Sequence, residues 1–145
     1  MRRNSACDSQ GHAAGDAALT DVAYLLRKRL RAFDLAYRIG GEEFLILLPG
    51  ASMGETSKLA EELRAAVAAE TVGDGTSLTA SFGVSASTPG EPFNYDLVFA
   101  AADSTLYEAK SGGRNAVRER QPAVSWESTS SARMHAPSAA TSTAS

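Results

Sequence analysis

The sequence predicts an α+β fold, a two-layer ferredoxin-like sandwich in the order βαββαβ whose first, central strand is missing or unrecognisable. Two observations predict it: an apolar stripe at helical spacing is followed by two strand-like runs around a glycine pair, and two further helices flank a third strand-like run. In such a sandwich the first strand lies between the hairpin and the last long strand. Residues 1–7 are too polar to be that buried strand, since they include Arg2, Arg3 and Asn4.

The first predicted helix spans residues 15–32. Apolar side chains recur there and just beyond at spacings of three and four, which is the pattern of one buried helix face: Leu19, Val22, Ala23, Leu26, Leu30 and Phe33. Residues 35–39 and 43–48 are predicted strands, and Gly40 and Gly41 the tight turn between them. Glycine suits this turn because hairpin turns commonly need a positive φ.

The second half of the chain continues with a helix, a strand and a helix. Ser52 and Glu55 match a capping box, so a second helix is predicted from there to about residue 70. Residues 78–86 form a predicted strand. A third helix over residues 96–111 is predicted to end at the glycine pair that follows it, and residues 116–117 are predicted to make a short last strand.

From Gln121 onward the composition changes to serine, alanine and threonine, without apolar periodicity. Such a segment buries too little apolar surface to fold, so we expect disorder there. We therefore divide the chain into residues 1–7, a divergent N-terminus, residues 8–120, one folded domain, and residues 121–145, a disordered tail.

Length, charge and composition exclude several classes of protein. The 145 residues suit one domain, and the net charge of −3 argues against a protein that binds a nucleic acid polymer through its phosphates. The single cysteine, Cys7, excludes an internal disulfide and cysteine-rich metal sites. No apolar run is long enough to span a bilayer, and the start does not resemble a secretory signal. We therefore expect a cytoplasmic protein without a membrane partner.

The hairpin carries the first candidate site. Glu42, at its turn, would project a hard oxygen ligand suited to Mg²⁺. The alternative is an ordinary hairpin with two solvated acids, Glu42 and Glu43. Two other charged residues have a simple structural explanation. Asp16 could interact favourably with the dipole at a helix start, and Lys110 could do so at a helix end.

The series of motifs as a whole resembles the GGDEF family of diguanylate cyclases over residues 8–117, with the hairpin as a GGEEF variant. The motifs fall in order along the chain: Gly11 and His12, Gly15 and Asp16, Arg31 and Asp34, the hairpin 40–44, the strand 78–86, Ala102 and Asp103, Leu106 and Tyr107, Ala109 and Lys110, and residues 113–115. The resemblance implies a nucleotide-cyclase palm fold.

The resemblance also implies an enzyme of bacterial signal transduction, a nucleotidyltransferase. Such transferases condense two GTP molecules into cyclic di-GMP and release two pyrophosphates. Each subunit of a homodimer holds one GTP, and each 3′-hydroxyl attacks the α-phosphorus of the other nucleotide. Mg²⁺ or Mn²⁺ neutralises phosphate charge in displacements of this kind.

Within the hairpin, the resemblance assigns each residue a part. Glu42 matches the metal-binding, catalytic acid, and Glu43 its catalytic neighbour, which supports the metal or deprotonates the hydroxyl. Gly40 and Gly41 would let the turn lie against the nucleotide phosphates.

Outside the hairpin, four residues match substrate-binding positions of the family. Asp16 matches the acid that accepts hydrogen bonds from guanine. Leu19 would line the base pocket, although its place in the apolar stripe favours a core position. Lys110 and Arg114 match the basic pair that contacts the triphosphate, where a point charge and a forked guanidinium hold phosphate oxygens.

A second ligand site is implied by Arg31 and Asp34, which match the RxxD pair of the family's inhibitory product site. Arginine can contact guanine O6 and N7 together, which suits cyclic di-GMP. Arg38 precedes the hairpin as in the family, with a structural or secondary product-contact role. The alternative for the pair is a helix-terminal arginine and a loop aspartate.

The chain departs from the family where the first strand should be. That strand normally has the pattern acid, apolar, acid, then an aromatic, a lysine and an Asn-Asp pair. Here Cys7 replaces the asparagine, the lysine falls on Asn4, and the second metal-binding acid would precede Met1. We therefore expect an N-terminally truncated family member with weakened activity. The alternative is a degenerate module that binds cyclic di-GMP or GTP without catalysis.

Overall fold

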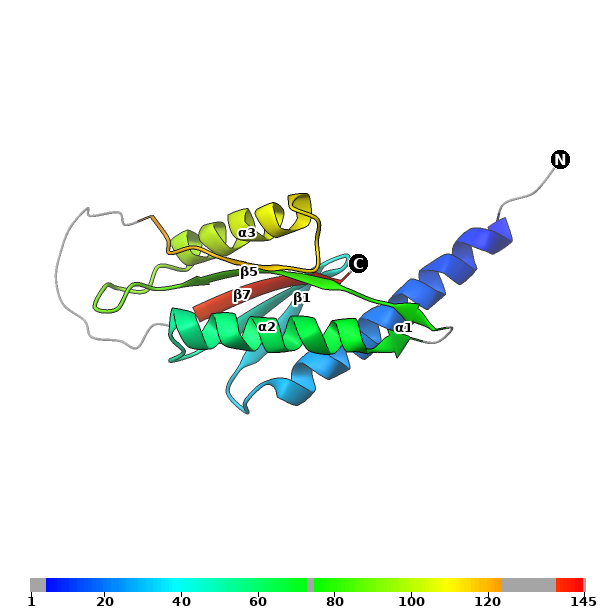
Figure 1. Cartoon of the computed structure of the whole chain (residues 1–145), viewed down its shortest axis with the longest axis horizontal. Coiled ribbons are helices and arrows are strands. Elements are labelled where there is room, and N and C mark those ends of the chain that lie inside the picture. The colour runs from blue at the N-terminus through cyan, green and yellow to red at the C-terminus, as the bar shows by residue number, and fades with distance from the viewer. Residues whose placement is uncertain (1–4, 73–74, 124–137, 145) are drawn as a thin grey trace.

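The computed structural model describes residues 5–72, 75–123 and 138–144; for residues 5–14, 72, 76 and 138 it describes the backbone alone. The elements follow one another along the chain (Figure 1) as α1 Ser5–Arg29, β1 Leu35–Gly40, β2 Glu43–Leu48, α2 Met53–Ala69, β3 Thr71–Val72, β4 Thr76–Ser77, β5 Ala80–Ala86, α3 Tyr95–Ser111, β6 Val117–Glu119 and β7 Ser138–Ala144.

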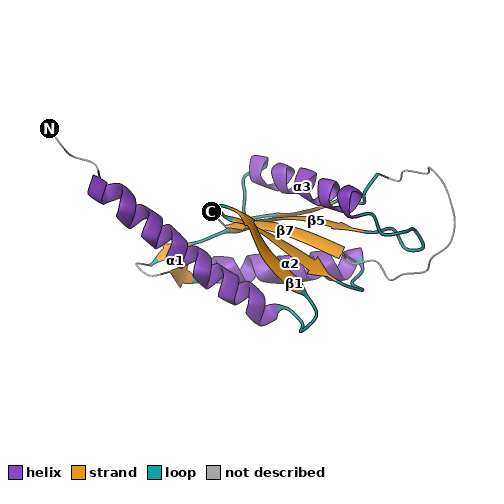
Figure 2. Cartoon of the chain, turned by 180° about the vertical axis from the view of Figure 1, so that it is seen from behind, coloured by secondary structure: helices purple, strands orange, loops and turns teal. Residues whose placement is uncertain are grey.

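A five-stranded sheet in the order β1-β2-β7-β5-β6 forms the middle of the molecule. Helices α1 and α2 cover one face, and α3 covers the other (Figures 1 and 2). The sheet with α1 and α2 is the predicted α+β sandwich, and α3 adds a helical layer on the opposite face. The short strands β3 and β4 pair separately as a ribbon beyond α2.

The central place in the sheet belongs to β7, which runs antiparallel to both β2 and β5. Thr141 is the residue that lies opposite Leu45 on one side and Gly83 on the other. The expectation of disorder is therefore wrong for residues 138–144. The physical reason is that the facing edges of β2 and β5 need backbone partners, and small side chains fit between two helical layers. Residues 124–137 lie outside the described residues.

The helix α1 is longer at its start and shorter at its end than predicted. It begins at Ser5 and ends at Arg29, and its C-terminal half packs Val22, Leu25 and Leu26 against the sheet. Phe33, predicted to belong to the apolar stripe, lies beyond the helix end and is 60% exposed. The turn that follows Arg29 ends the helical periodicity, so the spacing no longer places Phe33 inward.

The predicted capping box begins α2. The hydroxyl of Ser52 accepts the Glu55 backbone N–H at 3.3 Å, and the Glu55 carboxylate accepts the Ser52 backbone N–H at 2.8 Å. These two bonds satisfy donors that a helix start leaves unpaired. The buried residues then recur every three or four positions, at Thr56, Ala60, Leu63 and Val67.

The two faces of the sheet differ in side-chain size. Towards α1 and α2, β5 presents Phe82 and Val84, both fully buried in the main core. Towards α3, the alternate positions of β5 are Ser81, Gly83 and Ser85. A Cβ added to Gly83 would lie 2.0 Å from the backbone oxygen of Ala102, so α3 rests directly on the strand's backbone.

Among the described residues no helix has the length and apolar character needed to cross a membrane.

We predict that Gly83→Ala destabilises the fold by about 3 kcal/mol or more, because the new methyl group overlaps the α3 backbone and cannot be relieved by a side-chain rotation. Urea unfolding measures the change. Gly54→Ala is the matched control, since a Cβ there meets no atom within 4 Å beyond its chain neighbours and its own helix backbone. In the first turn of α2 it should raise stability by less than the roughly 0.5–1 kcal/mol expected in a helix centre. Equal effects of the two changes would contradict the close packing of α3.

We predict that the contribution of Glu55 to stability depends on pH. The Ser52 backbone N–H and then the Ser52 hydroxyl bond the carboxylate, which holds the pKa of Glu55 below its ordinary value of 4.5. A lowered carboxylate pKa stabilises the fold above the ordinary value, and the contribution is lost as pH falls through the folded-state pKa. Glu55→Ala should therefore weaken the fold at neutral pH and less so well below pH 4.5, measured by urea unfolding. An equal loss of stability in Glu55→Ala at both pH values would contradict this contribution of the capping bonds.

Candidate functional site

The hairpin between β1 and β2 closes on Gly41 and Glu42, with Gly40 paired to Glu43 and an irregular register after Arg38. Neither Gly40 nor Gly41 has a positive φ, so the predicted reason for glycine at this turn is wrong. No described atom lies within 4 Å of a Cβ added at either position. Packing within the described chain therefore does not require these glycines, whereas the close approach of a ligand to the turn would.

Arg38 holds the turn in place. Its Nε and Nη2 donate to the backbone oxygen of Gly41 at 2.8 and 2.5 Å. The same Nη2 lies 3.9 Å from Oδ1 of Asp16 on α1, whose side chain is 74% exposed. Arg38 thus links the hairpin to α1 and lies at the hairpin end of β1, away from Arg31 and Asp34.

The C-terminal end of α3 meets the start of β2. Nζ of Lys110 donates to Oε1 of Glu43 at 2.9 Å, between side chains that are 24% and 38% exposed. Arg114 follows in the loop after the helix, where its backbone has a φ of 62° and its N–H donates to the Ala109 oxygen at 3.0 Å. The predicted basic pair is therefore split: Lys110 contacts the hairpin, and Arg114 is exposed.

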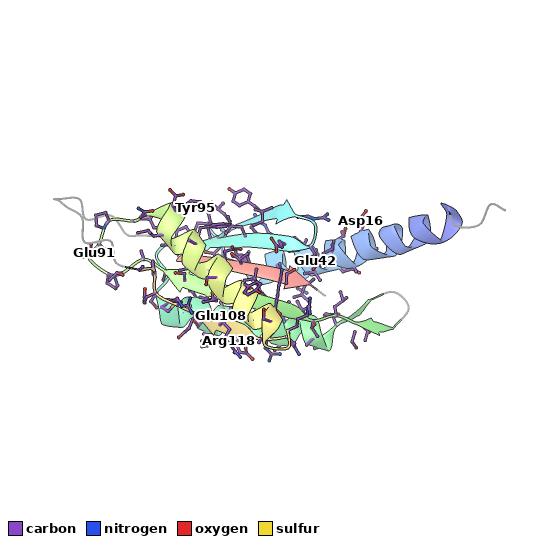
Figure 3. All side chains as sticks on the ribbon, turned by 90° about the horizontal axis from the view of Figure 1, so that it is seen from above. Asp16, Glu42, Glu91, Tyr95, Glu108 and Arg118 are labelled. Carbon is purple, nitrogen blue, oxygen red and sulfur yellow. The ribbon has the colours of Figure 1, made fainter. Side chains whose placement is uncertain are left out.

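Strand β7 reaches the hairpin from the centre of the sheet. The Ala144 N–H and the Thr143 hydroxyl both donate to the backbone oxygen of Glu42, at 3.4 and 3.3 Å. Thr143 is fully buried, whereas Glu42 is exposed. Figure 3 shows Glu42 and Asp16 at one end of the sheet and Glu91 at the other. The main chain of Glu42 is thus supported from within, and its carboxylate lies at an open surface.

The contacts of β7 and the ion pair between Lys110 and Glu43 were not anticipated from the sequence. The tail has no apolar alternation that would indicate a strand, so the sequence did not predict that Thr143 and Ala144 contact the hairpin. Lys110 and Glu43 each matched a family position, but pattern alone does not indicate that they contact one another. Leu19, the remaining candidate, is partly buried and packs against the main core.

Arg31 and Asp34 lie in the turn before β1, at the opposite end of that strand from the hairpin. At about 3.3 Å per residue, the strand separates them from Gly41 by roughly 20 Å. Asp34 is 3% exposed, and its Oδ2 accepts the Arg31 backbone N–H at 2.8 Å. The Asp34 carboxylate therefore closes the turn, while the Arg31 side chain is exposed.

A divalent metal at the hairpin would need ligands beyond the chain's own side chains. Among the described residues, no three His, Cys, Asp or Glu side chains are grouped so that they could hold a metal ion. Mg²⁺ commonly binds one or two carboxylates together with phosphate oxygens. Glu42 fits such a site if a nucleotide supplies the phosphate.

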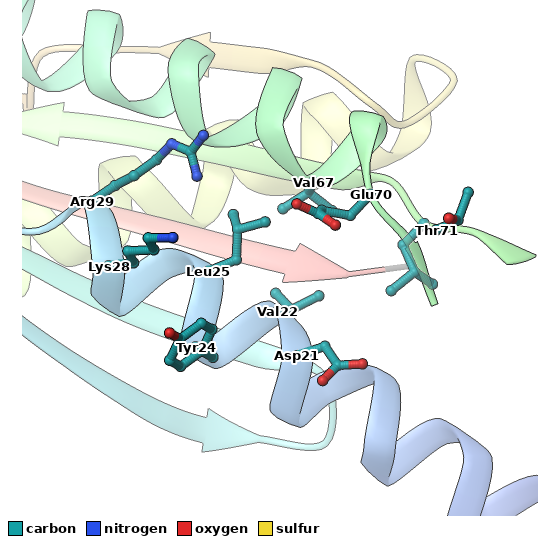
Figure 4. A pocket seen from close by; sticks show the side chains of 10 residues that line it. Asp21, Val22, Tyr24, Leu25, Lys28, Arg29, Val67, Glu70 and Thr71 are labelled. Atoms are coloured by element: carbon teal, nitrogen blue, oxygen red, sulfur yellow. The ribbon is translucent and has the colours of Figure 1, made fainter. Parts of the chain in front are cut away.

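The surface also has a pocket of about 450 Å³ between α1 and α2 (Figure 4). None of the predicted site residues lines it. Its walls are Val22, Leu25, Val67 and Leu78 with a polar rim that includes Lys28, Arg29 and Glu70. The hairpin, where acidic and basic side chains meet, is therefore the stronger candidate site.

Comparison with known proteins gives consistent results. The family model described as "Diguanylate cyclase, GGDEF domain" matches residues 4–116. The diguanylate cyclase DgcP of Pseudomonas aeruginosa is 45% identical over 111 residues, which are 74% of this chain and 16% of that protein. The response regulator PleD of Caulobacter vibrioides is 39% identical over 115 residues, 76% of this chain and 25% of that protein. The chain thus spans a quarter or less of these relatives.

Solved structures agree with this match. The active GGEEF domain of a diguanylate cyclase from Vibrio cholerae superposes with a TM-score of 0.71 at 29% identity, covering 80% of this chain and 74% of that one. The GGDEF domain of DgcB from Caulobacter crescentus, in complex with cyclic di-GMP, gives 0.69 at 31% identity, covering 77% and 68%. The family model matches most of this chain and the hairpin is in place, so the chain belongs to the GGDEF domain family of diguanylate cyclases.

Proposed function

We propose that this chain is a diguanylate cyclase domain of bacterial second-messenger signalling, which condenses two GTP molecules into cyclic di-GMP. The observation that carries the proposal is the arrangement around the hairpin turn. An open glycine turn, the exposed acid Glu42, the acid Asp16 of α1 and the cation Lys110 of α3 are gathered at one end of the sheet.

The triphosphate of GTP would lie against the glycine turn. Lys110 neutralises Glu43 in the present structure, at 2.9 Å. A bound triphosphate offers that ammonium group a stronger partner, which would release Glu43 to accept a proton. Arg114, exposed in the next loop, is the second cation within the same part of the chain. Glu42 would hold Mg²⁺ or Mn²⁺ together with phosphate oxygens, and the metal would supply charge neutralisation.

The reaction needs two nucleotides, and the hairpin between β1 and β2 would hold one of them. The 3′-oxygen of one GTP forms a bond to the α-phosphorus of the other, the bond from that phosphorus to pyrophosphate breaks, and the hydroxyl proton passes to Glu43. Asp16, 74% exposed, would accept the guanine N1–H and N2–H₂ donors. A homodimer that brings two hairpins face to face, in the cytoplasm where GTP is available, completes this proposal.

A second candidate has its own support. The strand in the central place of the sheet, Ser138–Ala144, contains no acid, whereas the family's first strand normally carries two. The second candidate is therefore a module that binds cyclic di-GMP without turnover, with Arg31 as its base contact. The DgcB domain, 31% identical to this chain, is a relative whose structure contains cyclic di-GMP.

We predict that Glu42→Gln lowers the rate of cyclic di-GMP formation by at least about tenfold, because an amide is a poorer metal ligand than a carboxylate. Purified chain is incubated with GTP and Mg²⁺, and the nucleotides are separated by chromatography. Glu91→Gln, which changes an exposed glutamate at the other end of the sheet, is the control. Unchanged turnover in Glu42→Gln would contradict the assignment of the site, and no turnover in the parent chain would favour the second candidate.

We predict that Arg31→Ala abolishes calorimetric binding of cyclic di-GMP, since it removes the exposed guanidinium that would contact the guanine edge. Arg31 is preferable to Asp34 for this test, because the buried Asp34 carboxylate bonds the turn and its loss would disturb folding. Arg118→Ala, an exposed arginine on β6, controls for the loss of one positive charge. Equal affinity in Arg31→Ala and the parent chain would exclude this placement of the product site.

A further inference from the structure

The central strand of the sheet comes from the far end of the chain. β7 pairs along its whole length with β5 and along nearly all of it with β2. Yet its covalent connection to the rest of the domain is the segment 124–137, which follows β6. The remaining strands and the three helices are contained in residues 5–123. Residues 5–123 therefore leave a position between β2 and β5 that is occupied by β7 from the end of the chain.

The side chains of β7 make few specific interactions that only its own chain could provide. They are small and buried, with alanine at 139, 140 and 144. Thr141 Oγ1 is buried without a hydrogen-bond partner among the described residues, and so is Ser85 Oγ on β5. Backbone pairing is thus the main attachment of β7, and an identical strand from another copy would pair in the same way.

A sheet without β7 between β2 and β5 is energetically unfavourable. If β7 leaves, the edges of β2 and β5 expose unpaired backbone groups in the middle of the sheet, and such edges bind another strand readily. Residues 124–137 are numerous enough for β7 to pair with another copy of the chain. At up to about 3.5 Å per residue, a segment of that length spans at most roughly 50 Å.

We propose that two copies of this chain exchange β7, so that Ser138–Ala144 of each copy lies between β2 and β5 of the other. Every contact of β7 is kept in the exchange, and the balance between monomer and dimer is set by concentration and by the entropy of the connecting segment. In the exchanged dimer, Thr143 and Ala144 of one copy support the Glu42 main chain of the other. The proposal does not depend on catalysis.

Single-cysteine chains test the exchange directly. In a Cys7→Ser background, one chain carries Ser85→Cys and the other Ala139→Cys, two small residues that lie opposite each other in the β5–β7 register. The two chains are mixed, refolded together at high concentration and oxidised. The expected product is a disulfide-linked heterodimer, which runs at twice the chain mass on a non-reducing gel. Mass spectrometry of the linked peptides confirms which two cysteines have joined.

Register provides the matched control. Thr143 lies opposite Ser81, four residues along β7 from Ala139 and thus about 13 Å away, so Ser85→Cys mixed with Thr143→Cys should not cross-link. The double variant Ser85→Cys/Ala139→Cys, refolded dilute, should close within one chain. Internal closure of the double variant with no heterodimer from the mixture overturns the exchange. Failure of the double variant to close overturns the placement of β7 on which the proposal depends.

Discussion

The backbone pairing of β7 with β2 and β5 is the interaction on which the rest of the structure depends. Without it the sheet would divide into the hairpin on one side and β5 with β6 on the other. Both cores cross this boundary, since Ala140 and Ala144 lie in the cluster under α1 and α2, and Ala139 in the cluster under α3. A strand of small residues therefore sets the spacing between two larger apolar surfaces.

The candidate site depends on this unbroken pairing across the sheet. Its groups belong to four elements: Asp16 to α1, Glu42 to the hairpin, Lys110 to α3, and Thr143 to β7. Arg38 joins the first two through the Gly41 oxygen, and Lys110 joins the hairpin to α3 through Glu43. Each link is short and local, but the four elements meet at one end of the sheet only because the strands beneath them are paired.

The features that could be predicted from the sequence are those encoded by neighbouring residues. The capping box at Ser52, the strand predicted at residues 78–86 and the helix predicted at residues 96–111 each have a local pattern. The structure confirms all three, with the strand at Ala80–Ala86 and the helix at Tyr95–Ser111. The position of β7 could not be predicted, because it follows from the unpaired edges of strands far away in the chain. The same holds for the pair of Lys110 and Glu43, and for Asp34, whose burial depends on how α1 ends.

The contact between Gly83 and α3 has a mechanical consequence. The helix has no side-chain layer between its backbone and the strand at that point, so it already packs as close to the strand as the two backbones allow. Lys110 lies eight residues beyond Ala102, about 12 Å along the helix axis at 1.5 Å per residue. The depth at which α3 packs on β5 therefore helps to set where the ammonium group of Lys110 lies beside the hairpin.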